Sequence, residues 1–545
     1  MQFSMNSAIM EGTSYYFNCL GVLLPYEFTG PKDEFLACRR TAWLGVNLNN
    51  TPVYDVYGPD AAKALNKICV NRDFSLMKPG DSKHALICND QGKMLADGVI
   101  MCKEEGVYRS YWLAPVLEYF ITTSGLDVHG EYNPDEYFFQ IDGPKSLEIL
   151  EEATQTDLHD IKFAKNKKVK ICGTDMVVHR LGMSGALAYE VHGAAEDAEI
   201  AYRRIRDVLE KFDGRLQGTR NYSIINHTPG GYPNQLQHYS YPLLTSGEGL
   251  ARFAAQKCFV PPVVGSAAAC PDIVTATPFD VGWSRCINWD HDFMGKEALM
   301  ELKKTRPRTC VTLEWDPDDV ADTFASQFRG KDVEPYDAIE KYTQLSDAST
   351  GFTIRGDLVL VDGETVGVAT GKTYAYFENR MISLAFINKE YAEEGREVVV
   401  LWGNPGGPQK EIRAKVARFP YYNGEFRNET FDTEKIPHPD FEAMKATPVE
   451  GDYDVVVKSP MGPMPGSFHY KVENGKLTGT ATSAGVTVDI TDGALNKNEF
   501  THSMVMNTPM GPMPLKVTGD VVYDRIAGTM GEGPMAMRFT GHRVK

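Results

Sequence analysis

Cysteine and histidine are the residue types whose spacing would reveal a metal site or a reactive thiol. The chain has ten cysteines and twelve histidines. No two cysteines lie within four residues of each other, and the sequence contains neither C-x-x-C nor H-E-x-x-H. The spacing therefore predicts no metal site, and reduced thiols in a reducing cytoplasm are the expected state of the ten cysteines.

Glycine and serine motifs exclude several other common chemistries. The segment Gly247-Glu-Gly249-Leu-Ala-Arg252 begins like a dinucleotide-binding loop but has arginine where the last glycine belongs. No phosphate-binding G-x-x-x-x-G-K-[ST] segment occurs. In Gly182-Met-Ser-Gly185 the serine is followed directly by glycine, so this is not the nucleophile elbow of a hydrolase.

Composition and charge narrow the class of protein. Of 545 residues, 42% are hydrophobic and 24% charged, which is typical of a globular protein and excludes collagen-like and disordered chains. With 56 Lys and Arg against 73 Asp and Glu, the net charge is −17, which argues against nucleic acid as a partner. No stretch approaches the roughly 20 apolar residues of a membrane span, so no membrane is expected and the predicted location is the cytoplasm.

A repeated strand–turn–helix pattern organises the first half of the chain. Residues 52–58 alternate like a strand and lead into a helical stretch at 59–68. The same order recurs at 137–144 and 145–153, and a further helix with a charged face is expected at 196–212. The recurrence predicts two similar α+β subdomains.

Short strands dominate the next part of the chain. Six are expected, and their spacing favours a compact barrel or sandwich; they are 309–315, 357–361, 365–370, 381–387, 397–402 and 411–416. A polar, proline-containing linker follows. The predicted organisation is an α+β region at 1–303, a β-barrel domain at 304–425, a linker at 426–450 and a last domain at 451–545.

The last domain is an internal duplication. Ser459-Pro-Met-Gly-Pro-Met-Pro465 recurs as Thr508-Pro-Met-Gly-Pro-Met-Pro514, an offset of 49 residues. Lys476-Leu-Thr-Gly-Thr480 recurs at the same offset as Arg525-Ile-Ala-Gly-Thr529. Neither half could bury a face alone, so the pair is expected to form one small β-barrel or sandwich. Nine of the 21 methionines lie here, and core filling is favoured over an adaptable contact surface.

Four segments resemble, in order, motifs of the glycine-cleavage T-protein superfamily. Asn89–Gly98 resembles its "n..G.i.DD" segment, and Leu181–Glu190 its "yTGe.GfE" segment. Thr277–Leu299 is similar to the region that ends in "dFiGreAL", and Gly367–Gly371 to the C-terminal "G..TSG". The resemblance covers residues 26–422. It implies two interleaved α+β subdomains and a β-barrel domain, to which the duplicated all-β domain is appended.

Within the superfamily the chain is most similar to tetrahydrofolate-dependent aryl O-demethylases of the vanillate and syringate type. The residues that carry this likeness are Tyr26-Glu-Phe-Thr29, Val311–Trp315 and Asp319–Ser326. The resemblance implies a cytoplasmic methyltransferase of one-carbon metabolism and aromatic catabolism. It would move a methyl group from a small methoxylated, expected to be aromatic, substrate to N5 of tetrahydrofolate.

The resemblance also suggests residues that hold the folate. Glu190 matches the glutamate that accepts hydrogen bonds from the pterin, with an exposed strand residue as the alternative. Asp97 matches an aspartate near the reacting nitrogens, with a turn cap as the alternative. Arg220 could bind the folate tail or the substrate, or form a surface ion pair. Trp283 or Trp289 could stack on a ring, or pack in the core.

The leaving-group acid is expected in the loop of residues 230–247. The match with the O-demethylases places their tyrosine at Tyr241, with Tyr239 second and Tyr232 also in the loop, while His238 is an alternative acid or substrate contact. Tyr26 is expected to line the substrate pocket.

Two departures from the family concern the substrate. Asn50, in Leu48-Asn-Asn50, stands where the O-demethylases have a histidine pair. Ser110 replaces an arginine that would bind a substrate carboxylate, and Arg109 would face the other side of the strand. A methyl donor other than vanillate is therefore expected.

Two rival functions belong to the same superfamily. Aminomethyl, N-methyl or S-methyl transfer to tetrahydrofolate is the first, although the arginine-rich segment of the T-protein is replaced by Thr219–Asn226. A non-catalytic folate-binding protein is the second, although the K-G-C-Y-x-G-Q-E motif of that branch is absent. The oligomeric state, including a homo-oligomer, is left open.

Overall fold

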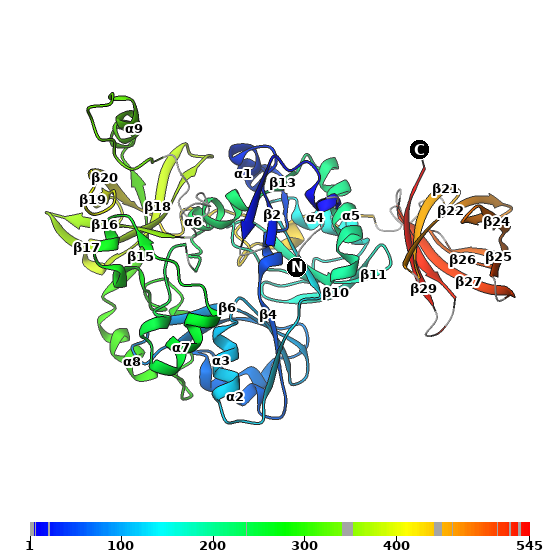
Figure 1. The fold of residues 1–545 in the computed structure, drawn as a ribbon, viewed down its shortest axis with the longest axis horizontal. Helices are drawn as coiled ribbons and strands as arrows, with labels where there is room; N and C mark the ends of the chain where they lie inside the picture. The colour runs from blue at the N-terminus through cyan, green and yellow to red at the C-terminus, as the bar shows by residue number, and fades with distance from the viewer. Residues whose placement is uncertain are drawn as a thin grey trace.

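Three bodies lie in a row along the longest axis of the molecule (Figure 1). The computed structural model describes residues 5, 7–19, 22–235, 237–339, 353–440, 449–459, 462–496, 498–508, 511–522, 525–531, 533 and 536–544. A central α+β body separates a β-barrel at one end from the duplicated β domain at the other. The predicted α+β class with an appended all-β domain is confirmed.

Two interleaved sheets form the central body. Within the five-stranded sheet the strand order is β5-β6-β7-β4-β8, and within the six-stranded sheet it is β10-β11-β12-β9-β3-β13. The strands of the first are β4 (Val53–Tyr57), β5 (Ser82–Cys88), β6 (Met94–Glu104), β7 (Val107–Tyr111) and β8 (His129–Tyr132). Those of the second are β3 (Trp43–Gly45), β9 (Glu136–Asp142), β10 (Asn166–Ile171), β11 (Thr174–His179), β12 (Ala188–Ala194) and β13 (Arg215–Gln217). Since β4 to β8 are inserted between β3 and β9, the five-stranded sheet is continuous in sequence, whereas the six-stranded sheet is interrupted by it.

Helices pack around these sheets and follow the predicted pattern. They are α1 (Pro31–Arg40), α2 (Ala61–Ile68), α3 (Val116–Thr123), α4 (Ser146–Thr154), α5 (Ala198–Lys211), α6 (His227–Gly230), α7 (Glu248–Lys257), α8 (Lys296–Thr305) and α9 (Pro317–Ala325). The strand–helix pairs β4–α2 and β9–α4 are those expected from the recurrence. The helix expected from Pro59 begins at Ala61, because Pro59 and Asp60 form the turn that follows β4.

Six strands close the barrel. They are β15 (Arg308–Trp315), β16 (Ile354–Val361), β17 (Glu364–Ala375), β18 (Arg380–Asn388), β19 (Glu397–Trp402) and β20 (Lys410–Ala417). The order β16-β17-β18-β15-β20-β19 returns to its start through the β16–β19 pairing, and β14 (Val263–Val264) joins beside β16. Every strand expected between 309 and 416 is present; β19 and β20 alternate buried with more exposed residues, whereas β17 and β18 are buried along most of their length.

The duplicated domain is one rolled nine-stranded sheet. It consists of β21 (Gly451–Ser459), β22 (Gly462–Glu473), β23 (Lys476–Ser483), β24 (Val486–Asp489), β25 (Thr491–Asn496), β26 (Glu499–Thr508), β27 (Gly511–Val522), β28 (Arg525–Met530) and β29 (Met537–Arg543). The copies pair alike, since Ser459 faces Gly462 as Thr508 faces Gly511. The core of the roll contains Met504 and Met530.

Contacts with α5 attach this domain to the central body. The guanidinium of Arg525 lies 2.9 Å from the carboxylate of Asp207, and that of Arg538 lies 3.0 Å from Asp197. Ala527 joins the hydrophobic core beneath the six-stranded sheet. A hairpin of β1 (Tyr15–Cys19) and β2 (Val22–Glu27) precedes the central body.

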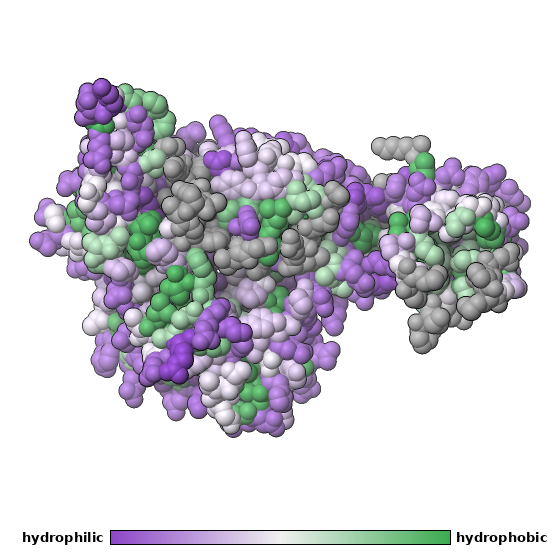
Figure 2. Space-filling view, viewed as in Figure 1, coloured by the Kyte–Doolittle hydropathy of each residue, from purple (hydrophilic) through white to green (hydrophobic). Residues whose placement is uncertain are grey.

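The face drawn in Figure 2 is largely hydrophilic, with hydrophobic residues scattered among the polar ones. Among the described residues no helix combines the length and the apolar character needed to cross a membrane.

Candidate functional site

A cavity of about 630 Å³ lies between the two sheets of the central body. Its walls are mainly apolar and aromatic, with Tyr111, Trp112, Phe138, Tyr222 and Trp283 among them. Its volume is that of a small-molecule site, and its few polar groups are therefore the ones that can orient a ligand.

Asp97 of β6 lines this cavity and accepts hydrogen bonds from two phenols. The hydroxyl of Tyr241 lies 2.6 Å from Oδ1 of Asp97, and that of Tyr239 donates to the same oxygen. The backbone N–H of Asp97 donates in turn to the Tyr241 oxygen, at 2.9 Å. Tyr241 lines the cavity and has a second acceptor, Oε1 of Gln235, at 2.6 Å, whereas Tyr239 is fully buried behind it.

Burial and the neighbouring carboxylate set the protonation of both phenols. Burial raises the pKa of Tyr239 and of Tyr241 well above its usual value, and the negative charge of Asp97 raises it further. Both hydroxyls therefore keep their protons at neutral pH, and the single proton of Tyr241, for which Asp97 and Gln235 compete in this structure, lies at the cavity wall.

His84 of β5 completes this cluster. Its Nε2 lies 3.3 Å from Oδ2 of Asp97, and its ring meets Trp283 edge to face, with centroids 4.5 Å apart. Burial lowers the pKa of His84, but hydrogen bonds to Asp97 and to the thiol of Cys286 outweigh it and raise the pKa to about 10. The cluster therefore holds an imidazolium beside a carboxylate at neutral pH.

Glu190 of β12 is buried and also lines the cavity. Its closest basic neighbour is His179, whose Nδ1 lies 3.6 Å from Oε2, too far for a strong hydrogen bond. The charges of Glu190 and Asp142 reinforce the effect of burial and raise the pKa of Tyr222. Because its closest basic neighbour is too far for a strong hydrogen bond, the buried carboxylate of Glu190 can still accept hydrogen bonds. It is therefore suited to a ligand that donates N–H groups.

Asn47 and His227 each have a buried polar atom without a hydrogen-bond partner among the described residues. The side-chain amide nitrogen of Asn47 is a donor, while its oxygen accepts from Thr219 at 2.7 Å. Nδ1 of His227 lies 3.0 Å from the carbonyl oxygen of Tyr232, so it carries the proton and leaves Nε2 as an unpaired acceptor. Both residues line the cavity.

These groups fit the tetrahydrofolate that the sequence suggests. A pterin is flat and carries amino and ring N–H donors together with carbonyl and ring-nitrogen acceptors. The aromatic walls match its faces, the carboxylate of Glu190 matches its donors, and Asn47 and His227 offer one donor and one acceptor more.

Trp283 lies in the cavity wall, but three other candidates lie outside it. The guanidinium of Arg220 forms an ion pair with Glu27 of β2. Tyr26, on the same strand, is half-buried and is not among the lining residues, whereas Phe17 of β1 is. Trp289 packs on the hydrophobic core, with the ammonium of Lys303 over its ring.

His238 is buried away from the cavity and its ring nitrogens are already bonded. The N–H of Asn234 donates to Nδ1 at 2.9 Å, and Nε2 lies 2.9 Å from the hydroxyl of Thr228. Burial lowers the pKa of His238 to about 3, so the ring is neutral. Asn50 ends the turn Asn47–Asn50, and its side chain lies outside the described residues.

Arg109 does not line the cavity, although it lies two residues from Tyr111 on β7 and both side chains bond to Glu136. Its guanidinium is held 2.5 Å from Asp55 and 2.8 Å from Glu136, while the neighbouring Tyr111 lines the cavity.

Sequence reasoning missed His84 and two cations of the cavity. His84 pairs with Val99, two residues along β6 from Asp97, so both side chains share one face of the hairpin. The alternation of the two strands could have revealed this. Lys257 and Arg285 are exposed and line the cavity. They are 28 residues apart in the chain, so no local sequence pattern predicts that they share this cavity.

Comparisons with known proteins place the chain in a family. The model of the GCVT N-terminal domain matches residues 7–226. A sesamin methylene transferase of Sinomonas sp. is 43% identical over 449 residues, covering 79% of this chain and 97% of the relative. A syringate O-demethylase of Sphingobium sp. is 29% identical, and the match covers 73% of this chain and 90% of the relative.

A solved structure agrees at the level of the fold. The glycine cleavage system aminomethyltransferase T of Bartonella henselae superposes with a TM-score of 0.55 at 16% identity, covering 77% of this chain and 96% of the other. The extent of the match to the methylene transferase and the agreement in fold lead to one conclusion: the chain belongs to the glycine-cleavage T-protein (aminomethyltransferase) superfamily of enzymes, near its O-demethylases.

Proposed function

We propose that the protein transfers a one-carbon unit from an ether oxygen of a small aromatic substrate to N5 of tetrahydrofolate. The observation that carries this is one cavity in which the Asp97–Tyr241–His84 cluster and the buried carboxylate of Glu190 both lie. Enzymes of the superfamily are folate-dependent in general. When bound, tetrahydrofolate would supply the nucleophilic nitrogen that accepts the carbon.

Glu190, Asn47 and His227 hold the pterin in this proposal. The carboxylate accepts hydrogen bonds from the amino and ring N–H groups, while Asn47 donates and His227 Nε2 accepts. All three are buried, so water does not compete for these bonds. Fixed placement of the acceptor nitrogen against the donor carbon accounts for up to about 7–11 kcal/mol of the barrier in reactions of this kind.

Tyr241 stabilises the leaving oxygen. Loss of the carbon from an aryl ether makes a phenolate, and a positioned hydroxyl that bonds to the developing charge lowers the barrier. Tyr241 is the phenol that lines the cavity, while Tyr239 lies behind it and fixes the position of Asp97. Asp97 aligns Tyr241, and the imidazolium of His84 balances its charge.

Lys257 and Arg285 are better placed than Arg220 for an anionic folate tail. Both are exposed residues of the cavity wall, where a chain that leaves the cavity would pass. Arg220 is instead paired with Glu27.

The nature of the carbon divides this proposal into two cases. A methyl ether would give a phenol and 5-methyltetrahydrofolate. A methylene bridge between two aryl oxygens would give a catechol and 5,10-methylenetetrahydrofolate, with N5 and N10 each giving up one proton to the two oxygens. The name of the relative that is 43% identical favours the second case, and that of the relative that is 29% identical favours the first.

Product analysis tests the proposal and separates the two cases. The full chain is incubated with tetrahydrofolate and, in turn, a panel of methoxyaryls and a panel of methylenedioxyaryls, and the folate product is identified by mass. Glu190→Gln is expected to lower activity and folate affinity by at least tenfold. Arg252→Ala, on the exposed surface of α7, is the control. Folate binding without a one-carbon product from either panel would refute the enzymatic proposal.

A further inference from the structure

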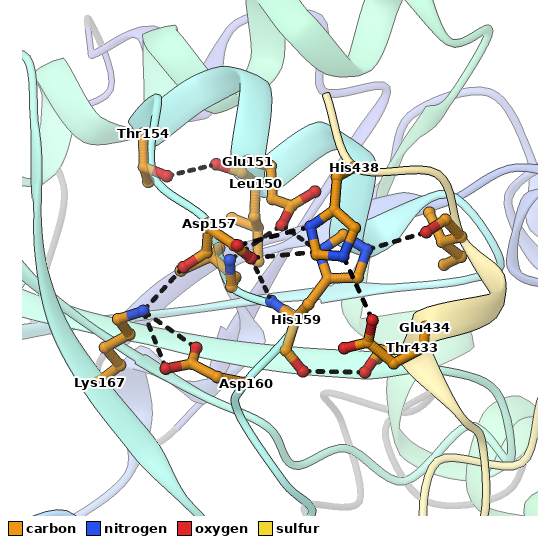
Figure 3. Close-up of polar contacts among 12 residues, drawn as sticks. Leu150, Glu151, Thr154, Asp157, His159, Asp160, Lys167, Thr433, Glu434 and His438 are labelled. Atoms are coloured by element: carbon orange, nitrogen blue, oxygen red, sulfur yellow. Dashed lines mark hydrogen bonds and ion pairs between the residues drawn. The ribbon is translucent and has the colours of Figure 1, made fainter. Parts of the chain in front are cut away.

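A cluster of histidines and carboxylates lies outside the cavity just described. Asp157 and His159 follow α4, and His438 belongs to the segment that leads from the barrel toward the duplicated domain (Figure 3). Glu151 of α4 and Glu434 flank them. None of the five lines the cavity, and the proposed function uses none of them.

The two rings turn the same nitrogen toward one carboxylate. Nδ1 of His159 lies 3.3 Å from Oδ1 of Asp157, and Nδ1 of His438 lies 3.4 Å from Oδ2. One ligand atom from each of the three residues lies within 4.8 Å of the others. Metal–ligand bonds of 2.0–2.1 Å in a tetrahedral site place neighbouring ligand atoms about 3.3–3.4 Å apart. The two nitrogen–oxygen distances to Asp157 are thus those of neighbouring ligands around a small divalent ion.

The opposite nitrogen of each ring has an acceptor of its own. Nε2 of His159 lies 3.0 Å from the carbonyl oxygen of Ile436, and Nε2 of His438 lies 3.3 Å from Oε2 of Glu434. Both acceptors favour the proton on Nε2, which leaves the lone pair on Nδ1. Histidines that bind metals are oriented in this way, with the second nitrogen donating to a carbonyl or a carboxylate.

Glu151 supplies an independent sign that a cation belongs here. Its side chain is fully buried, and Oε2 has no hydrogen-bond partner among the described residues. Oε1 lies 2.7 Å from Nδ1 of His159 and accepts from the backbone N–H of Leu158, so Oε2 is the oxygen left without a partner. A divalent ion bound here would balance this buried carboxylate.

We propose that Asp157, His159 and His438 bind one divalent transition ion of the zinc class, with Glu151 or water as the remaining ligand. Imidazole nitrogen with carboxylate oxygen is a donor set that suits Zn²⁺ better than Ca²⁺ or Mg²⁺. The rings are stacked with centroids 3.7 Å apart, and binding turns the ring of His438 so that both lone pairs converge. The side chain of His438 is 48% exposed, so solvent lies on one side of the ring as it turns.

Such an ion would fasten the segment of Glu434 and His438 to the central body. Hydrogen bonds already hold this segment there, with Thr433 donating to the carbonyl of His159 at 2.9 Å. The ion would add bonds between residues about 280 positions apart in the chain, and it would fix where the connection to the duplicated domain starts. The site is therefore structural, and folate chemistry does not depend on it.

Metal titration of the full chain tests this proposal. Protein treated with a chelator is titrated with Zn²⁺ by calorimetry and with Co²⁺ by visible absorption, and thermal unfolding is followed in parallel. Wild-type protein is expected to bind one ion more than His438→Ala and Asp157→Asn do, with a Tm that rises on binding. His129→Ala, which alters an exposed histidine 3.8 Å from Asp127, is the matched control and should bind as wild type does.

The variants also distinguish binding at the proposed site from binding at another candidate site. His179, Glu190 and His192 form a second group of close ligand atoms near the cavity, so ions bound there remain in His438→Ala. Equal stoichiometry and equal affinity in wild type and His438→Ala would overturn the proposal, as would an absence of binding in the wild type. Glu190→Gln should keep the ion, which separates this result from a failure of the proposed transferase.

Discussion

At the scale of single residues, the site depends on how many donors converge on Asp97. Two phenols and one imidazole reach its two oxygens, and only Tyr241 and His84 among them line the cavity. The difference between Tyr241 and Tyr239 is therefore one of position, since both are protonated and both bond to the same oxygen. Position decides which of them can meet a substrate.

Replacement of each phenol by phenylalanine separates these roles. Tyr241→Phe is expected to lower kcat by about 10²–10⁴-fold, because the leaving oxygen loses its hydrogen-bond donor. Tyr239→Phe should lower kcat less and should reduce thermal stability, since it leaves a buried carboxylate oxygen with one donor fewer. Steady-state kinetics and thermal unfolding measure the two effects. A larger kcat loss in Tyr239→Phe would contradict the assignment.

The raised pKa of His84 predicts how stability depends on pH. Burial lowers the pKa of His84, but its bonds to Asp97 and Cys286 outweigh burial and raise the pKa to about 10 in the folded protein. In the unfolded chain the pKa is about 6.5, so the folded state binds the proton more tightly. This contribution to stability is complete below about pH 6.5 and is lost as the pH rises through about 10.

The variant His84→Gln isolates that contribution. The difference in free energy of unfolding between wild type and His84→Gln should shrink as the pH rises from about 6 to about 10.5. Urea denaturation at a series of pH values measures it, and His129→Gln, at an exposed position, serves as the control. A difference that stays constant across this range would show that the ring is neutral in the folded protein.

At the scale of elements, the close approach of β6 to β7 holds Asp97 in place. Gly98 has no room for a side chain, because an added Cβ would lie 2.1 Å from the carbonyl oxygen of Tyr111 and 3.0 Å from the side chain of Leu113. The first of these neighbours is backbone and cannot move without shifting β7.

Gly98→Ala is therefore expected to reduce both stability and activity. The strand must move away from β7, at a cost of about 1–3 kcal/mol, and Asp97 moves with it. Denaturant unfolding and kcat/KM are the measurements. Gly424→Ala, where nothing lies within 4 Å of the added Cβ, is the control. Full activity in Gly98→Ala would mean that the hairpin tolerates the shift.

The elements themselves were largely predictable, whereas the assembly of the site was only partly so. Short strands at regular spacing predicted every barrel strand, and the expected strand–helix pairs are β4–α2 and β9–α4. Asp97 and Glu190 were identified from local motifs. The positions of Arg220 and His238 could not be predicted, because both depend on loops with no periodic pattern. Arg220 forms an ion pair with Glu27, and His238 bonds to Thr228 and Asn234.

At the scale of the whole molecule, the duplicated domain stands apart from the chemistry. It contributes none of the described residues that line the cavity, and it meets the central body through ion pairs of Lys458, Arg525 and Arg538 and through the side chain of Ala527. Partly exposed ion pairs contribute about 0–1 kcal/mol each, so the attachment is weak in energy.

Deletion of residues 449–545 is accordingly expected to spare catalysis. The shortened chain should bind folate and turn over substrate within about twofold of the full chain, with a Tm lower by a few degrees because Ala527 no longer covers the core. Calorimetry and product analysis measure both. If the shortened chain fails to fold, the duplicated domain is part of the folding unit.

The insertion of β4–β8 between β3 and β9 also fixes the order in which the chain can fold during synthesis. The inserted sheet ends at Tyr132 and its strands pair with no later strand, although its hydrophobic core also includes later residues such as Tyr239 and Phe386. The six-stranded sheet must wait for β13, which pairs in parallel with β3 across some 170 residues. The strand pairing of Asp97 therefore needs no residue after Tyr132, whereas its hydrogen bonds and the closed cavity need the loop that carries Tyr239 and Tyr241.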